Sequence, residues 1–217
     1  MWMKVFFASF LGLGVFILMQ VLSPVLAFKV WEITYYDSSQ LLADPLSFSG
    51  QSGGGQVLGV SISNVYNFPA FVAKGTVAPP YKEFNLAIPS IKLEKTKVLV
   101  WSNDFENSLA SLADTALPGE KGNVFVSGHS SLVRELALKG DKAFFANLPK
   151  IKKNDEVFVE AIGQRYIYQV VGTKIVEPKD TYVINPPDNE GRYLTLMTCV
   201  PPGFNTKRLI VLTKLKQ

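Results

Sequence analysis

One cysteine and one histidine end two apolar runs in this chain of 217 residues. Cys199 ends residues 193–199, and His129 ends residues 122–129. Arg208 begins the next apolar run. If the two C-terminal runs form a hairpin, Arg208 lies opposite Cys199 or one register step away, where cross-strand Cβ atoms are about 4.5–5.5 Å apart. A thiol nucleophile needs a proton-transfer group and a donor that stabilises an oxyanion. Cys199, His129 and Arg208 could supply these three roles.

Each of these residues also has an ordinary structural interpretation. A single cysteine on a strand is usually a small, buried and unreactive core residue. A single histidine usually serves packing or lies at the surface, and Arg208 could be a solvated charge at the rim of a sheet. An unpaired thiol outside the cell is prone to oxidation, so its presence there suggests a functional role. In an exported domain, the combination therefore makes catalysis about as well supported as the structural interpretation.

The composition argues against several other kinds of site. The net charge of +4 is mild and forms no basic stripe, so nucleic-acid binding is not expected. One cysteine excludes an intramolecular disulfide, and one cysteine with one histidine cannot form a Cys/His zinc site. Carboxylates could still bind calcium, but no EF-hand-like run indicates it. We expect no cofactor and no metal.

Residues 1–28 are predicted to be a cytoplasmic start followed by a transmembrane signal-anchor. Residues 5–28 carry no charge, and a helix rising about 1.5 Å per residue can then cross a hydrocarbon core of about 30 Å. Lys4 favours a cytoplasmic N-terminus, although Lys29 on the far side weakens that argument. A signal peptide cleaved before Phe28 is the alternative, but the run is longer than a typical signal core. Either interpretation predicts an exported domain.

The rest of the chain divides into a linker and one β-rich domain. Residues 29–56 include a stretch rich in Ser and Gly and are predicted to be the linker. In residues 57–217, short runs rich in β-branched and aromatic residues alternate with Pro, Gly, Asn and Asp, which predicts an all-β barrel or sandwich. Residues 102–114 are predicted to be a helix from the spacing of their apolar residues. Residues 130–140 could be a short helix or a loop.

Several motifs resemble those of the sortase family. Residues 195–199, Thr-Leu-Met-Thr-Cys, resemble the Thr-Leu-x-Thr-Cys signature, and residues 208–211 supply its downstream arginine. Residues 116–131 resemble the sortase segment that ends in the catalytic histidine. The resemblance extends, in the family's order, over about residues 84–215. It implies a closed sortase-like β-barrel of about eight strands with short helices.

The resemblance also implies a reaction. Cys199 would attack a threonine carbonyl in a sorting signal of the Leu-Pro-x-Thr-Gly type and form a thioacyl enzyme, which an amine would resolve. His129 would transfer the protons, and Arg208 would hold the substrate backbone and stabilise the oxyanion. Thr198 could contact the substrate, or could be a β-former that pairs across the sheet.

The uncharged N-terminal segment predicts a single-pass protein of the cell membrane with an extracellular catalytic domain, and the resemblance implies what that domain acts on. Its partners would be surface proteins that bear a C-terminal sorting signal, and an amine acceptor such as a peptidoglycan precursor or a pilin lysine. The subclass stays open, because residues 111–119 lack the second histidine of many sortases and Asp44-Pro45-Leu46 lacks the aromatic residue of a pilin-class lid motif.

Other functions remain open on the sequence. One is another exported Cys/His acyl-transfer enzyme of the cell wall, although the His-Gly-Cys cluster of L,D-transpeptidases is absent. A second is a non-enzymatic anchored β-domain with a buried thiol. A serine hydrolase that uses Ser127 or Ser130 is a weaker alternative, because no Gly-x-Ser-x-Gly elbow is present.

Overall fold

The computed structural model describes residues 2–36, 60–65, 68–73, 75, 78–104, 107–130, 143–201 and 206–216. The chain separates into two compact units, Met1–Asp37 and Ser38–Gln217. Much of the predicted linker, residues 37–56, lies outside the described residues, as do residues 131–140 of the segment predicted to be a short helix or a loop.

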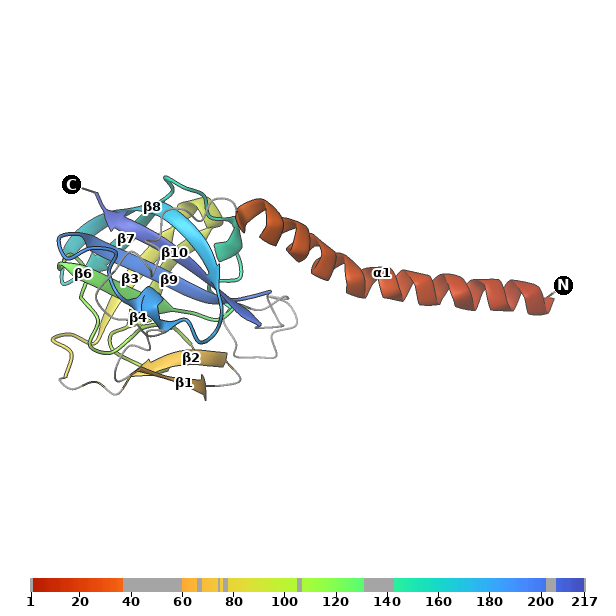
Figure 1. Ribbon diagram of the computed structural model, residues 1–217, viewed down its shortest axis with the longest axis horizontal. Helices are drawn as coiled ribbons and strands as arrows, with labels where there is room; N and C mark the ends of the chain where they lie inside the picture. The colour runs from red at the N-terminus through yellow and green to blue at the C-terminus, as the bar shows by residue number, and fades with distance from the viewer. Residues whose placement is uncertain are drawn as a thin grey trace, which may run out of the picture. The chain divides into compact units, whose positions relative to one another are not determined.

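The first unit holds helix α1, Trp2–Tyr36 (Figure 1). The helix continues through residues 29–36, which were predicted to begin the linker. Within the described part of the chain, no helix is long and apolar enough to span a bilayer. The predicted transmembrane helix is therefore not supported.

The second unit contains a closed barrel of eight strands in the order β10-β8-β7-β3-β4-β5-β6-β9 (Figure 1). The strands are β3 Glu83–Ile88, β4 Leu93–Leu99, β5 Leu109–Ser111, β6 Gly122–Ser127, β7 Glu156–Ala161, β8 Gln164–Val176, β9 Arg192–Val200 and β10 Lys207–Leu215. The pairs β4–β5 and β6–β9 are parallel, and the other neighbours are antiparallel. The predicted all-β fold and closed barrel are confirmed.

Among the residues of this unit that the structure describes, the helices are short 3-10 turns: η2 Pro89–Ile91, η3 Leu148–Lys150 and η4 Thr181–Ile184. The helix predicted over residues 102–114 is wrong, because part of that segment is strand β5. Every residue of β5 is buried between β4 and β6, and Asp114 has a left-handed φ of 59°. Pairing within the barrel overrides the apolar spacing that favoured a helix.

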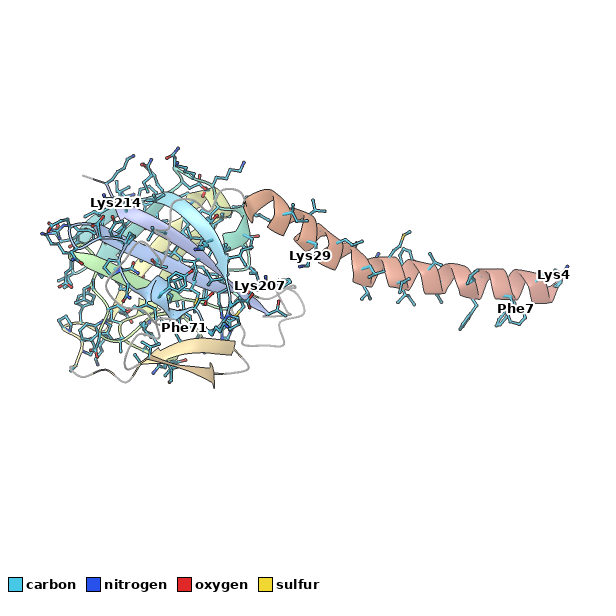
Figure 2. All side chains as sticks on the ribbon, viewed as in Figure 1. Lys4, Phe7, Lys29, Phe71, Lys207 and Lys214 are labelled. Carbon is cyan, nitrogen blue, oxygen red and sulfur yellow. The ribbon has the colours of Figure 1, made fainter. Side chains whose placement is uncertain are left out.

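A second layer covers part of the barrel. β3 alternates buried and less buried residues, as expected for a strand with one face in the core, whereas β9 is buried at every residue from Tyr193 to Val200. A two-stranded hairpin, β1 Val60–Val65 and β2 Phe68–Ala73, supplies part of that cover. Phe71 of β2 lies between the hairpin and the barrel (Figure 2), with its ring centroid 5.8 Å from that of Phe125 in β6.

Candidate active site

The strand that carries Cys199 lies between the strands that lead to the other two candidate residues. β9 pairs with β6 on one side, and His129 follows β6 by two residues. On its other side β9 pairs with β10, which carries Arg208. The barrel order therefore brings a thiol, an imidazole and a guanidinium to three adjacent segments.

The guanidinium lies beside the thiol by strand register. In the antiparallel β9–β10 ladder, Arg208 is the direct partner of Cys199, as the sequence predicted. Directly opposed residues project their side chains from the same face of a sheet. Both side chains are fully buried, with 0% of each residue exposed. Figure 2 locates this end of β10 through Lys207, which precedes Arg208, while Lys214 marks the opposite end.

The histidine reaches the same place through a parallel pairing. Ser127 of β6 is the register partner of Met197 in β9, and His129 and Cys199 each follow by two residues. Gly128 N donates a hydrogen bond of 3.1 Å to Met197 O, so the two segments stay together beyond the end of β6. His129 is partly exposed. Its Nε2 atom is nevertheless buried, as are the side chains of Cys199 and Arg208.

Gly128 is required where the chain passes from β6 to His129. A side chain at this position would overlap Leu109 and would lie 2.8 Å from Cδ2 of Phe145. Phe145 in turn donates its backbone N–H to His129 O at 3.1 Å. The same aromatic residue therefore packs on the glycine and fixes the backbone of the histidine. The sequence analysis singled out neither Gly128 nor Phe145. The only available signal was the glycine directly before His129, since a glycine often marks a close approach of the backbone to other atoms.

Gly128→Ala should destabilise the protein by about 1–3 kcal/mol, because a methyl group has no room there. It should also reduce activity, since Phe145 must move and it holds His129. Gly163→Asn is the control: Gly163 has a left-handed φ of 71°, which asparagine tolerates, and nothing lies within 4 Å. Urea unfolding of both variants checks the effect. A Gly128→Ala protein as stable as the wild type would contradict this packing.

Burial dominates the electrostatics of the thiol. Desolvation raises the pKa of Cys199 to about 11, and the positive charge of Arg208 opposes that rise without cancelling it. Desolvation likewise lowers the pKa of Arg208, although its ordinary value is so high that the guanidinium stays charged. With the site covered, the thiol is protonated at neutral pH.

The hairpin contributes to that burial. Phe71 and Ala73 of β2 belong to the same buried cluster as Cys199 and Met197. Phe71→Ala should therefore let reagents reach the sulfur and raise the rate of Cys199 alkylation by about tenfold. Phe84→Ala is the matched control, because Phe84 is equally buried but lies outside that cluster. Equal acceleration in both variants would mean that general destabilisation, and not uncovering of the site, exposes the thiol.

Thr198 is fully buried, and its Oγ1 donates to Gly128 O at 2.8 Å. This bond crosses from β9 to the histidine segment, which agrees with the interpretation of Thr198 as a residue that pairs across the sheet. Contact of Thr198 with substrate stays a prediction.

Ser130 entered the sequence analysis only as a possible hydrolase nucleophile. In the structure, its Oγ donates a hydrogen bond of 2.5 Å to Cys199 O. Within the described ranges, no group of three or more His, Cys, Asp or Glu side chains could hold a metal ion.

The sequence is similar to known proteins over the barrel. A family model, the Sortase domain, matches residues 86–216. Sortase A of Bacillus anthracis is 30% identical over 129 residues, which cover 58% of this chain and 56% of that protein. Sortase D of Bacillus subtilis (strain 168) is 29% identical over 133 residues, covering 59% and 61%. The chain thus spans less than two thirds of the length of these curated relatives.

Solved structures share the same fold. Sortase A from Corynebacterium diphtheriae superposes with a TM-score of 0.55 at 27% identity, covering 64% of this chain and 63% of that one. Sortase C-1 from Actinomyces oris superposes with a TM-score of 0.54 at 27% identity, covering 62% and 73%. Both the matched residues and the fold therefore coincide with the barrel that carries the candidate site.

Proposed function

Because this chain belongs to the sortase family, we propose that it is a cysteine transpeptidase of the cell surface. It cleaves a Leu-Pro-x-Thr-Gly-like sorting signal through a thioacyl intermediate on Cys199. It then joins the acyl fragment to an amine of the cell wall or of a pilin. The observation that carries the proposal is the barrel order, in which β9 with Cys199 lies between the strands that lead to His129 and Arg208.

The proposed first half-reaction forms the thioacyl enzyme. As the Sγ atom of Cys199 attacks the threonine carbonyl, His129 accepts the thiol proton, and the carbonyl oxygen becomes negatively charged in the tetrahedral intermediate. Arg208, as the direct register partner of Cys199, is the donor for that oxyanion. The intermediate collapses by breaking the peptide bond, and His129 gives its proton to the departing amine. The C-terminal remainder of the signal then leaves.

The proposed second half-reaction reverses these roles. An acceptor amine attacks the thioester, His129 removes the extra proton from the amine and passes it to the sulfur, and Cys199 leaves as the thiol. One amide bond is broken and one is formed, so the overall exchange needs no external energy source or cofactor.

A peptide experiment tests the proposed function. The full chain is incubated with Leu-Pro-x-Thr-Gly-like peptides and hydroxylamine, and the products are identified by mass spectrometry. A cleaved peptide that ends in a hydroxamate, formed by the wild type and absent with Cys199→Ala, is the expected result. Hydroxamate formation by the alanine variant would exclude a thioacyl route through Cys199.

Full burial of the sulfur favours a second candidate, a non-enzymatic β-domain whose thiol is a core residue. The two candidates differ in the environment of the thiol. The enzyme requires Cys199 to react with small alkylating agents under native conditions and to respond to the charge of Arg208. The structural alternative requires alkylation only as fast as the whole domain unfolds. Absence of hydroxamate together with alkylation limited by unfolding would favour the structural alternative.

A further inference from the structure

The backbone ladder between β6 and β9 ends just before the residues that react. Its last backbone bond joins Gly128 N to Met197 O at 3.1 Å. Beyond that point, two side-chain hydroxyls replace the missing backbone bonds. Thr198 Oγ1 donates to Gly128 O at 2.8 Å, and Ser130 Oγ donates to Cys199 O at 2.5 Å.

These two hydroxyl bonds lie on either side of the histidine. Gly128 precedes His129 and Ser130 follows it, and each is tied to the segment that ends in Cys199. A third bond, from Phe145 N, holds the carbonyl of His129 itself. The backbone of His129 is therefore fixed before, at and after the residue, although no strand pairing continues there.

Both hydroxyls are buried, so the loss of either hydrogen bond would reduce the stability of the fold. Ser130 is 8% exposed and Thr198 is not exposed. A buried hydroxyl without a partner costs about 1–3 kcal/mol, so the geometry that keeps each bond is strongly favoured. Of the two, Ser130 is the more direct link, because its acceptor is the carbonyl of the nucleophilic residue.

We propose that Ser130 is a positioning residue of the transpeptidase, whose hydroxyl holds His129 in register with Cys199 through the Cys199 carbonyl. This inference rests on the proposed function. Ser130 touches no reacting atom and acts through the histidine that it follows. Proton transfer between an imidazole and a thiol or amine needs hydrogen-bond reach, and a displacement of about 1 Å can cost about 100-fold in rate.

Substitutions at two buried serines test the role. Ser130→Ala removes the bond to Cys199, and Ser130→Thr keeps a hydroxyl at the same position. Ser111→Ala is the matched control, because Ser111 is also buried and its Oγ accepts a hydrogen bond of 3.0 Å from Trp101 N, with no bond to the histidine segment. Peptide turnover and thermal melting are measured for all three variants and the wild type.

We expect Ser130→Ala to lower kcat by about 10- to 100-fold while KM stays within about twofold. Ser130→Thr should recover most of that loss. Ser111→Ala should lower the melting temperature comparably and leave kcat nearly unchanged. An unchanged kcat in Ser130→Ala, or an equal loss of kcat in Ser111→Ala, would overturn the inference.

A second readout does not depend on turnover. His129 is the single histidine of the chain, so one imidazole C2 proton signal reports on it in NMR spectra. In the wild type, alkylation of Cys199 with iodoacetate, which attaches a carboxylate, should raise the pH midpoint at which this signal titrates, because the β6–β9 register brings the new negative charge near the imidazole. In Ser130→Ala the shift should fall to less than half. An undiminished shift would overturn the positioning role, whereas absent turnover with an intact wild-type shift would count against the proposed function alone.

Discussion

Cys199→Ser should lower the rate of hydroxamate formation by at least about 1,000-fold, although it exchanges a single atom. A serine hydroxyl is a far weaker nucleophile than a thiol and needs stronger general-base assistance than this site supplies. Its register partner Arg208 is a cation and not a base. In the proposed scheme His129 acts as the base for a thiol, whose proton is removed far more readily than that of a hydroxyl.

Single-turnover kinetics with intact-mass detection of the acyl enzyme measure this effect. Met197→Leu is the control, because Met197 lies on the same strand two residues away, is equally buried and exchanges for leucine with little change in volume. That control should keep its rate within a few-fold. Turnover of Cys199→Ser within tenfold of the wild type would show that the thiol is not the nucleophile.

Arg208→Gln should lower the rate by about 100- to 1,000-fold, the usual cost of removing one oxyanion donor. It should also raise the pKa of the Cys199 thiol further. In the wild type, burial raises that pKa to about 11 while the charge of Arg208 works in the opposite direction. Without the guanidinium the thiolate loses its favourable neighbour, so alkylation of Cys199 should require a higher pH in the variant.

Alkylation rates measured from pH 7 upward, together with peptide turnover, check both effects. Lys207→Gln is the matched control: it removes one positive charge at the adjacent position of β10, from a side chain that lies 3.5 Å from Glu177. Its pH profile and turnover should stay close to those of the wild type. If the two variants behave alike, net charge and not the position opposite Cys199 would explain the result.

The sequence predicted part of this site because part of it is local. Cys199 and Arg208 lie on consecutive strands of one hairpin, so their facing positions follow from the register of two neighbouring apolar runs. The position of His129 depends on the parallel pairing of β6 with β9, which are far apart in the sequence. Alternating apolar residues indicate strands but do not encode which distant strand becomes the neighbour. For His129, the family resemblance and not the hydrophobic pattern indicated that it belongs beside Cys199.

One wrong prediction and one undetected hydrogen bond also have physical causes. Residues 102–114 have apolar residues at helical spacing. Strand β5 nevertheless forms within them, because backbone pairing with β4 and β6 and burial in the barrel outweigh that spacing. Ser130 entered the sequence analysis only as a possible nucleophile of a less favoured serine hydrolase. Its use as a hydrogen-bond donor to Cys199 O depends on the β6–β9 register and had no signal in the sequence.

The separation between the paired segments has a consequence for assembly. The bonds that join the histidine segment to β9 connect residues 69 and 70 positions apart, whereas Arg208 follows Cys199 on the next strand. Closing so long a loop costs more chain entropy than forming a hairpin, and pairings of this kind slow folding. A chain whose β6 and β9 have not yet paired carries the thiol and the guanidinium without the imidazole. In the proposed mechanism, the acid–base residue therefore joins the nucleophile only when the barrel closes, which would couple the onset of reactivity to the completion of folding.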